Sequence, residues 1–321
     1  MKSSIQTSSL IKNVNANKCF SKGKFKKYLP LFLMMLPGLF YLLVNNYLPM
    51  GGLVIAFKDV NFAKGIWSSD WVGFENFKYL FATRDAFIIT RNTIAYNLVF
   101  IILGNIINIT IAILLSEISK RFFANIYQTI ILLPHMISWV IVSYIIYAFL
   151  DVNGIMNNTI LPAMGFESIS WYMRAELWPY IIILVSFWKN MGFGVIVYLA
   201  SIFSIDNSYY EAAELDGATK WQQIKNITLP LLKPTVILLV MLALGRMFYA
   251  DFGLFYQVPL DSGMLYETTN VIDTYVFRAL LQRNDIGMAS AAGFYQSIVG
   301  FILVMTANFV IRKISRENAL F

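Results

Sequence analysis

Long apolar stretches alternate with shorter polar segments along the whole chain. An apolar stretch of about twenty residues is long enough to cross the hydrocarbon core of a bilayer as a helix. The pattern therefore predicts an all-α membrane protein with about six transmembrane helices, the first kinked at Pro37-Gly38. The predicted spans are residues 28–49, 87–115, 126–150, 178–203, 231–256 and 288–311.

The distribution of basic residues orients these spans. Lys and Arg gather in residues 1–26, at Lys120 and Arg121, and after the last span at Arg312 and Lys313. The positive-inside rule places such segments in the cytoplasm, so both termini are expected there. The chain then divides into a basic cytoplasmic arm, a six-span domain and a short cytoplasmic tail, at residues 1–26, 27–315 and 316–321. The segments expected outside are residues 50–85, 151–176 and 257–287.

A polar island, residues 206–230, separates the fourth span from the fifth and is expected on the cytoplasmic side. Ser208 and Glu211 have the spacing of a capping box, with Ser208 as the N-cap of a helix. Gly217 follows where the end of a helix often needs a residue with positive φ. The first half of the island therefore predicts a short helix closed by a glycine turn.

The second half of the island predicts another short helix. Thr219 and Gln222 form a second possible capping box. Leu229-Pro230 is expected to end this second helix, because proline lacks the backbone N–H that a continuing helix needs.

The island as a whole resembles the EAA loop of permease subunits in ATP-driven (ABC) importers. That pattern reads Glu-Ala-Ala, three residues, Gly, nine residues, Ile, one residue, Leu-Pro. Every fixed position is filled here: Glu211, Ala212, Ala213, Gly217, Ile227, Leu229 and Pro230. In this family the loop docks into a cleft of an ATPase subunit. The resemblance thus implies an ATPase-coupling role for these residues and for Asp216.

Residues outside the island extend the resemblance to the maltose-type, oligosaccharide branch of these permeases. They are Asn92-Thr93, Leu133-Pro134, Trp188, Leu199-Ala200 and Asp206. The resemblance implies a multi-pass permease of the bacterial cytoplasmic membrane that alternates between inward- and outward-facing states. It also implies a second homologous permease, a pair of ATPase subunits that bind ATP and Mg, and an extracytoplasmic solute-binding protein that delivers an oligosaccharide. No cofactor is expected in this chain.

Composition excludes several other classes of protein. The chain is 58% hydrophobic and 13% charged, whereas soluble domains carry about 25% charged residues. Its net charge of +7 follows from the basic cytoplasmic segments and does not indicate nucleic acid as a partner. No phosphate-binding loop, His-Glu-x-x-His or Gly-x-Ser-x-Gly motif is present, so neither ATP hydrolysis nor intramembrane catalysis is expected of this chain. A single histidine, His135, cannot form a metal site alone.

Charged side chains within the predicted spans are candidates for the substrate path, because they are costly in lipid unless paired or hydrated. Lys189 and Arg246 would favour an acidic oligosaccharide if they line a polar cavity. Alternatively, they pair with carboxylates on neighbouring helices or on the partner permease. The candidate substrate path is completed by Tyr249, Asp251, Tyr295 and Gln296.

The second span carries an unusual number of amide side chains. They are Asn92, Asn97, Asn105 and Asn108. In lipid such groups are expected to face other helices or a cavity.

Three other interpretations are compatible with the sequence. The chain could be a permease of the same family for a non-sugar solute. It could be a channel or secondary transporter, although no convincing internal repeat is visible and such a protein would not need an EAA loop. A six-span permease could also form a homodimer, since only the resemblance indicates a different partner.

Overall fold

The computed structural model describes residues 22–118 and 120–314, in two compact units that divide after Leu53. The predicted N-terminal arm lies outside the described residues up to residue 21, and so does the predicted tail at residues 316–321. Residues 22–26 already belong to the first helix, so the helix starts earlier than the sequence pattern predicted.

The first unit is helical. Helix α1 (Lys22–Leu42) is followed by a π-turn (Leu43–Tyr47), α2 (Leu48–Met50) and a 3₁₀ turn (Gly51–Phe57) that continues into the second unit. The α-helical pattern runs without a break through Pro37 to Leu42, and it changes only at the π-turn. The helix therefore departs from regular α geometry at the π-turn, later in the chain than the kink predicted at Pro37-Gly38.

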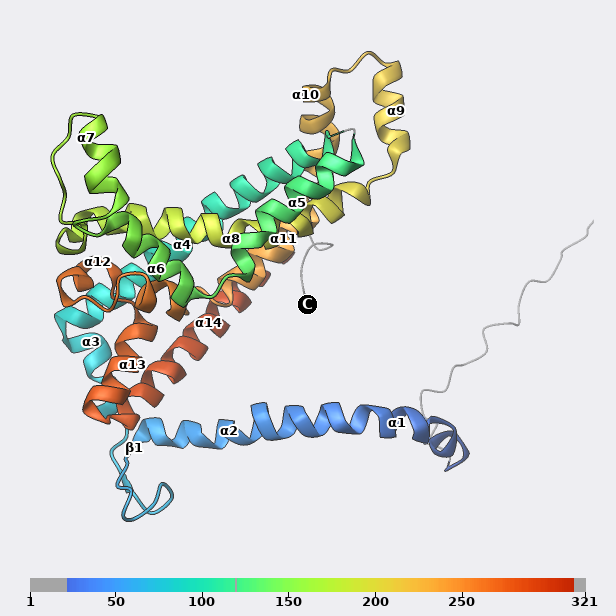
Figure 1. Ribbon diagram of the computed structural model, residues 1–321. Helices are drawn as coiled ribbons and strands as arrows, with labels where there is room; N and C mark the ends of the chain where they lie inside the picture. Colours follow the sequence, from blue (N-terminus) through green and yellow to red (C-terminus); the bar gives the residue numbers. More distant parts are fainter. Residues whose placement is uncertain (1–21, 119, 315–321) are drawn as a thin grey trace, which may run out of the picture. The chain divides into compact units, whose positions relative to one another are not determined.

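The remaining spans belong to the second unit (Figure 1). They are α4 (Arg84–Ser116), α5 (Arg121–Met136) with α6 (Trp139–Leu150), α8 (Trp178–Phe203), α11 (Leu229–Leu244) and α14 (Ile286–Ile314). Among the described residues, five helices are long and apolar enough to cross a membrane, or six if the bent pair α5–α6 is one span. The predicted fold class is confirmed.

The third span is broken in the middle. Helices α5 and α6 meet at 95° across residues Ile137 and Ser138, which adopt extended backbone conformations. Ser138 caps α6 by accepting the Ile141 N–H at 3.4 Å. Leu133, Pro134 and His135 lie in the last turn of α5, immediately before this break.

The fifth span also departs from prediction at both ends. Leu229-Pro230 does not stop the preceding helix: α10 (Lys220–Gln223) passes through a π-turn (Ile224–Thr228) directly into α11. Pro230 follows directly on the π-turn, where the regular i→i−4 hydrogen-bond pattern is already interrupted. At the other end α11 stops at Leu244, and an irregular stretch precedes the π-turn Gly253–Gln257, so the helix predicted to Tyr256 is twelve residues shorter.

Shorter elements gather at the ends of the spans. They are β1 (Lys58–Asp59) paired antiparallel with β2 (Asp70–Trp71), 3₁₀ turns Glu75–Phe77, Trp171–Met173, Ala175–Leu177 and Gly263–Leu265, the π-turn Met156–Ile160, and helices α3 (Tyr79–Ala82), α7 (Leu161–Ala163), α9 (Asn207–Leu215), α12 (Tyr266–Thr269) and α13 (Ile272–Arg283). Helices α9 and α10 lie at one end of α4 and α8, and α3, α7 and α12 at the other (Figure 1).

The core of the second unit forms where α4 and α8 pack side by side. Trp178 and Ile182 of α8 are fully buried near its first turns, together with Tyr96 of α4. Close packing in lipid depends on small residues, and Gly192 shows why. A Cβ at this position would lie 2.5 Å from the Ile131 carbonyl oxygen, so only glycine lets α8 approach α5 here.

Candidate coupling loop and substrate cavity

The polar island, called here the coupling loop (residues 206–230), begins with the exposed helix α9. Its N-cap is Asp206, whose carboxylate accepts the Ser208 N–H at 2.9 Å. This hydrogen bond holds the pKa of Asp206 below its ordinary value. The prediction of Ser208 as the cap was wrong by two residues, because an ionised aspartate one position before the helix supplies the acceptor instead.

A left-handed turn joins α9 to α10, as predicted. Gly217 has φ of +79°, and the Ala218 N–H donates to the Ala213 carbonyl at 2.9 Å, a pairing that closes the helix end. The predicted second capping box is also present, since Thr219 accepts the Gln222 N–H and Gln222 accepts the Thr219 N–H. The two short helices are therefore fixed relative to each other by backbone geometry.

Side-chain contacts brace the loop further. Lys220 forms an ion pair with Glu214 at 3.0 Å, which lowers the pKa of Glu214. The Tyr210 and Thr228 hydroxyls lie 2.9 Å apart. A cavity of about 500 Å³ lies between this braced loop and Ser116-Glu117 at the end of α4. The two polar segments that the sequence placed in the cytoplasm thus lie at the same end of the bundle.

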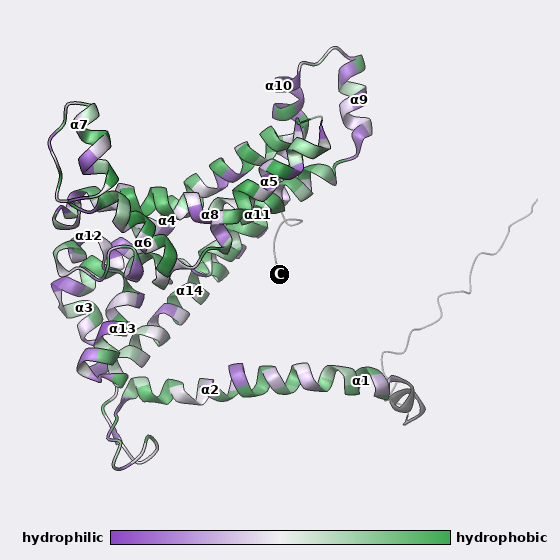
Figure 2. Cartoon of the chain, in the orientation of Figure 1, coloured by the Kyte–Doolittle hydropathy of each residue, from purple (hydrophilic) through white to green (hydrophobic). Residues whose placement is uncertain are grey.

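Most predicted coupling residues are accessible. Ala213 and Ile227 are partly buried, and the exposed ones are Glu211, Ala212, Asp216, Gly217, Leu229 and Pro230. Figure 2 shows α9 and α10 as largely hydrophilic beside more apolar spans. Two apolar side chains are exceptions that the motif did not reveal: Leu215 is 90% exposed and Trp221 is 70% exposed.

A second site is called here the substrate cavity because predicted substrate-path residues line it; it has a volume of about 650 Å³ and lies along α4, α8 and the irregular end of the fifth span. It brings together three of the predicted substrate-path residues: Arg246, Tyr249 and Asp251. The other lining residues are Asn97, Phe100, Ile101, Gly104, Asn105, Asn108, Asn190, Ala243, Ala250 and Phe252. None of the ion pairs formed among the described residues includes Arg246, so its guanidinium is available to a ligand.

The amides of α4 behave as their position in a span predicted. Asn105 and Asn108 line the cavity, and Asn92 bonds to the segment around α12. Tyr198 of α8 donates to the Oδ1 of Asn105. The Oδ1 of Asn108 is buried and has no hydrogen-bond partner among the residues that the structure describes.

Lys189, the other charged candidate for the substrate path, is not among the residues that line this cavity. Its side chain is 5% exposed, and its Nζ donates to the carbonyl oxygens of His135 at 3.0 Å and Pro134 at 3.5 Å. The same atom lies 4.9 Å from the centre of the Trp139 ring. The ammonium thus occupies the break between α5 and α6, where it donates to the His135 carbonyl and adds a second donor to the Pro134 carbonyl, which already accepts the Ile137 N–H. It neither lines the cavity nor forms an ion pair within the described part of the chain.

Tyr295 and Gln296 of α14 also lie behind the cavity lining. The Tyr295 ring packs edge-on against Phe248, with centroids 5.8 Å apart. Gln296 is buried and donates to the Phe248 carbonyl at 2.7 Å. A role of these two residues in the substrate path stays a prediction. Besides the fifth span, Tyr295 contacts the Phe81 ring and Gln296 donates to Asp273 of α13.

The two broken spans contact each other beside the cavity. The Trp139 indole N–H donates to Asp251 at 3.1 Å. A Cβ on Gly253 would lie 2.0 Å from the Trp139 ring, so the ring rests directly on the glycine backbone. Trp139 was not singled out from the sequence, where it resembles any other aromatic residue of a span.

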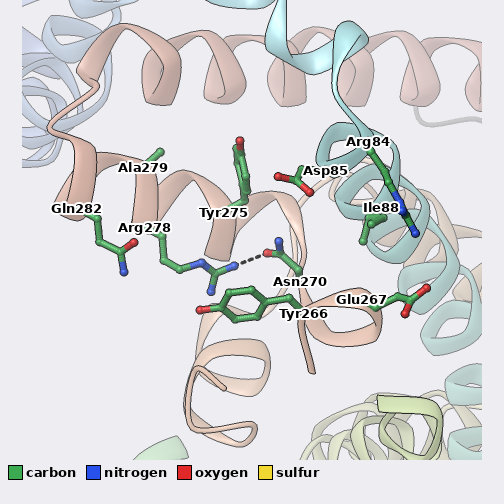
Figure 3. A pocket seen from close by; sticks show the side chains of 10 residues that line it. All are labelled: Arg84, Asp85, Ile88, Tyr266, Glu267, Asn270, Tyr275, Arg278, Ala279 and Gln282. Carbon is green, nitrogen blue, oxygen red and sulfur yellow. Dashed lines mark hydrogen bonds between the residues drawn. The ribbon is translucent and has the colours of Figure 1, made fainter. Parts of the chain in front are cut away.

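A smaller cavity of about 300 Å³ lies at the end opposite the coupling loop, between the start of α4 and helices α12 and α13 (Figure 3). Arg278 points into this cavity but already bonds to Asp261 at 2.5 Å and to Asn270, and it lies over the Tyr266 ring. Its charge is therefore used within the protein, where it fixes the residues that precede α13.

Comparison with known proteins agrees with these features. Residues 104–316 match the family model described as "Binding-protein-dependent transport system inner membrane component". Protein LplB of Bacillus subtilis is 36% identical over 90% of this chain and 90% of its own length. The polygalacturonan/rhamnogalacturonan transport system permease protein YteP of the same organism is 35% identical over 91% and 90%.

A solved structure is similar over nearly the whole chain. A chain of a bacterial ABC transporter involved in the import of the acidic polysaccharide alginate aligns with a TM-score of 0.82 and 34% identity. The alignment covers 91% of this chain and 98% of that one.

Proposed function

Because the chain belongs to the family of binding-protein-dependent transport system inner membrane components, we propose that it forms the translocation path for an acidic oligosaccharide. The family makes it a permease subunit of an ABC importer. The substrate's chemistry is the proposal, and the observation that carries it is the cavity beside the broken fifth span.

The cavity has the chemistry that an acidic sugar requires. Arg246 offers a planar array of donors suited to a carboxylate, and the amides of α4 offer donors and acceptors to hydroxyl groups. Phe100, Tyr249 and Phe252 supply rings that sugar faces can stack on. The similarity to the alginate importer, whose substrate is an acidic polysaccharide, supports the same class of ligand.

The coupling loop supplies the mechanical link to separate ATPase subunits, which bind ATP and Mg in this proposal. A compact projection braced by Gly217, the capping box and the Lys220–Glu214 pair can transmit a displacement without absorbing it. Leu215 and Trp221 offer apolar surface that a partner would cover. The π-turn at residues 224–228 connects the loop directly to the fifth span, and therefore to Arg246.

The remaining parts of the assembly follow the same reasoning. The end of the bundle that carries α7, α12 and α13 would receive an extracytoplasmic solute-binding protein, as the binding-protein complex of the alginate transporter supports. The coupling loop and both termini would then lie in the bacterial cytoplasm. A second homologous permease would complete the path.

Substitution of Arg246 tests the substrate proposal. In the purified importer, reconstituted with its partners, Arg246→Ala should raise the KM for a galacturonic-acid trisaccharide about tenfold or more, since a hydrogen bond to a charged group contributes roughly 1.5–3 kcal/mol. Uptake of the carboxyl-reduced trisaccharide should change little. Arg246→Lys should give an intermediate KM because it keeps charge but loses the planar fork. Lys313→Ala at the end of α14 is the matched control for charge removal.

Equal loss of both sugars in Arg246→Ala would contradict a role in recognising the carboxylate. Discrimination that stays at the unsubstituted level would contradict it as well, and would favour the interpretation of a neutral or non-sugar solute.

A further inference from the structure

The irregular stretch after α11, called here the strap (residues 245–251), interrupts the fifth span beside the substrate cavity. Non-helical backbone at membrane depth is tolerated only where protein or a water-filled cavity satisfies its polar groups. The strap carries Arg246, Tyr249 and Asp251. Whatever holds its backbone therefore sets the positions of the side chains that face the cavity.

Three side chains from three different helices bind four consecutive backbone residues of the strap. Asn97 of α4 donates to the carbonyl oxygens of Met247 and Tyr249, both at 3.0 Å. Gln296 of α14 donates to the Phe248 carbonyl at 2.7 Å. Asp273 of α13 accepts the Ala250 N–H at 2.7 Å.

Asp273 is the most unusual of the three because it is a carboxylate that forms none of the ion pairs among the described residues, although the positive charge of Arg246 acts on it from a longer distance. The same Oδ2 atom that accepts the Ala250 N–H also accepts from Gln296 at 3.3 Å. Burial raises the pKa of Asp273. A partly buried carboxylate is costly unless it accepts hydrogen bonds, and those from Ala250 and Gln296 offset this cost for Asp273.

Helix α13 is itself fixed at its first turn, where Asp273 lies. Thr93 of α4 accepts the Ile272 N–H at 3.1 Å, and Asn92 donates to the Asn270 carbonyl at 2.9 Å. Arg278 bonds to the side chain of Asn270 from the other side (Figure 3). The start of α13, and with it the backbone of Asp273, is thus held by α4 and by α13 itself.

From these contacts we infer that Asp273 is a positioning residue for transport, which fixes the strap together with Asn97 and Gln296 and so presents Arg246 and Tyr249 to the substrate. In this role Asp273 acts as a hydrogen-bond acceptor, and its negative charge is less important than its acceptor oxygen. The role in presenting these side chains rests on the proposed function of the cavity, whereas the role in holding the strap does not.

A matched pair of variants at Asp273 separates loss of the hydrogen-bond acceptor from loss of the negative charge. Asp273→Asn keeps an acceptor oxygen at the same place, and Asp273→Leu keeps the size of the side chain without an acceptor. In the purified, fully assembled importer, hydrogen–deuterium exchange of peptides covering residues 245–251 should be at least about tenfold faster in Asp273→Leu. Exchange in Asp273→Asn should stay within about twofold of the unsubstituted protein.

Two outcomes of the exchange measurement would overturn the inference. One is unchanged exchange of the strap in Asp273→Leu, and the other is equal acceleration in both variants. Should Asp273→Leu fail to assemble, Gln296→Met tests the same strap through Phe248 and should accelerate exchange of these peptides while those of α8 remain unchanged.

A transport assay distinguishes a positioning role of Asp273 from a purely structural one. Asp273→Leu should raise the KM for the galacturonic-acid trisaccharide at least about fivefold at an unchanged maximal rate per assembled complex. Asp273→Asn should have the KM of the unsubstituted protein. A fall in maximal rate with unchanged KM would contradict positioning. If the unsubstituted importer does not discriminate this sugar from its carboxyl-reduced form, the acidic substrate is refuted, while strap exchange still decides the role of Asp273.

Discussion

Single charged residues within apolar segments were the strongest clue in the sequence to functional positions, and the structure assigns them different tasks. Arg246 lines the substrate cavity, as the hypothesis of an acidic ligand requires. Lys189 satisfies carbonyls at the break in the third span. A sequence shows that a buried charge needs a partner, but the partner of Lys189 is the backbone of another helix. No residue pattern encodes the position of such a carbonyl.

Substitution of Lys189 should therefore affect stability more than specificity. Lys189→Met keeps the length and apolar stem of the side chain but leaves the His135 carbonyl without its donor, which costs about 1–3 kcal/mol. We expect a lower thermal midpoint of the purified complex, measured by intrinsic fluorescence, with an unchanged ratio of KM values for the acidic and carboxyl-reduced sugars. Wild-type stability together with a changed ratio would place Lys189 on the substrate path instead.

Among the elements, regular spans were the most predictable and broken spans the least. The predicted fourth span coincides with α8, since a long and mostly apolar run has no alternative to a helix in lipid, even where it includes Lys189 and Asn190. The third and fifth spans have equally apolar sequences, yet α5 ends at Met136 and α11 at Leu244. The break in the fifth span depends on side chains of other helices, such as Asn97 and Asp273, that accept or supply the missing hydrogen bonds.

The coupling loop was predictable because its turn depends on local chemistry. Gly217 has a φ that other residues adopt only with strain, and Gly217→Ala should therefore shift the angle between α9 and α10. We expect at least a severalfold loss of substrate-stimulated ATPase activity in the reconstituted importer at unchanged sugar binding. Gly217→Asn should recover most of the activity, because asparagine tolerates the left-handed region. Equal activity of Gly217→Ala and the unsubstituted protein would show that the loop does not need this geometry.

At the scale of the whole molecule, the chain exposes apolar surface that a single copy cannot bury. Leu215 and Trp221 project from an otherwise polar loop, and many apolar side chains of the spans are exposed as well. Lipid covers the exposed apolar side chains of the spans, whereas the coupling loop is expected in water. An exposed tryptophan there indicates a protein partner.

The exposed apolar surface of the coupling loop leads to a prediction about which proteins are purified together with this chain. A tagged chain extracted in mild detergent should bring with it an ATPase subunit and a second, different six-span permease, identified by mass spectrometry. Trp221→Ala should lower recovery of the ATPase severalfold and leave the second permease, because only the loop faces the ATPase. Recovery of an ATPase alone would instead indicate a homodimer, in which two identical cavities carry Arg246. A chain that is recovered without any ATPase would refute the importer assembly, in which a separate subunit supplies the phosphate-binding loop that this sequence lacks.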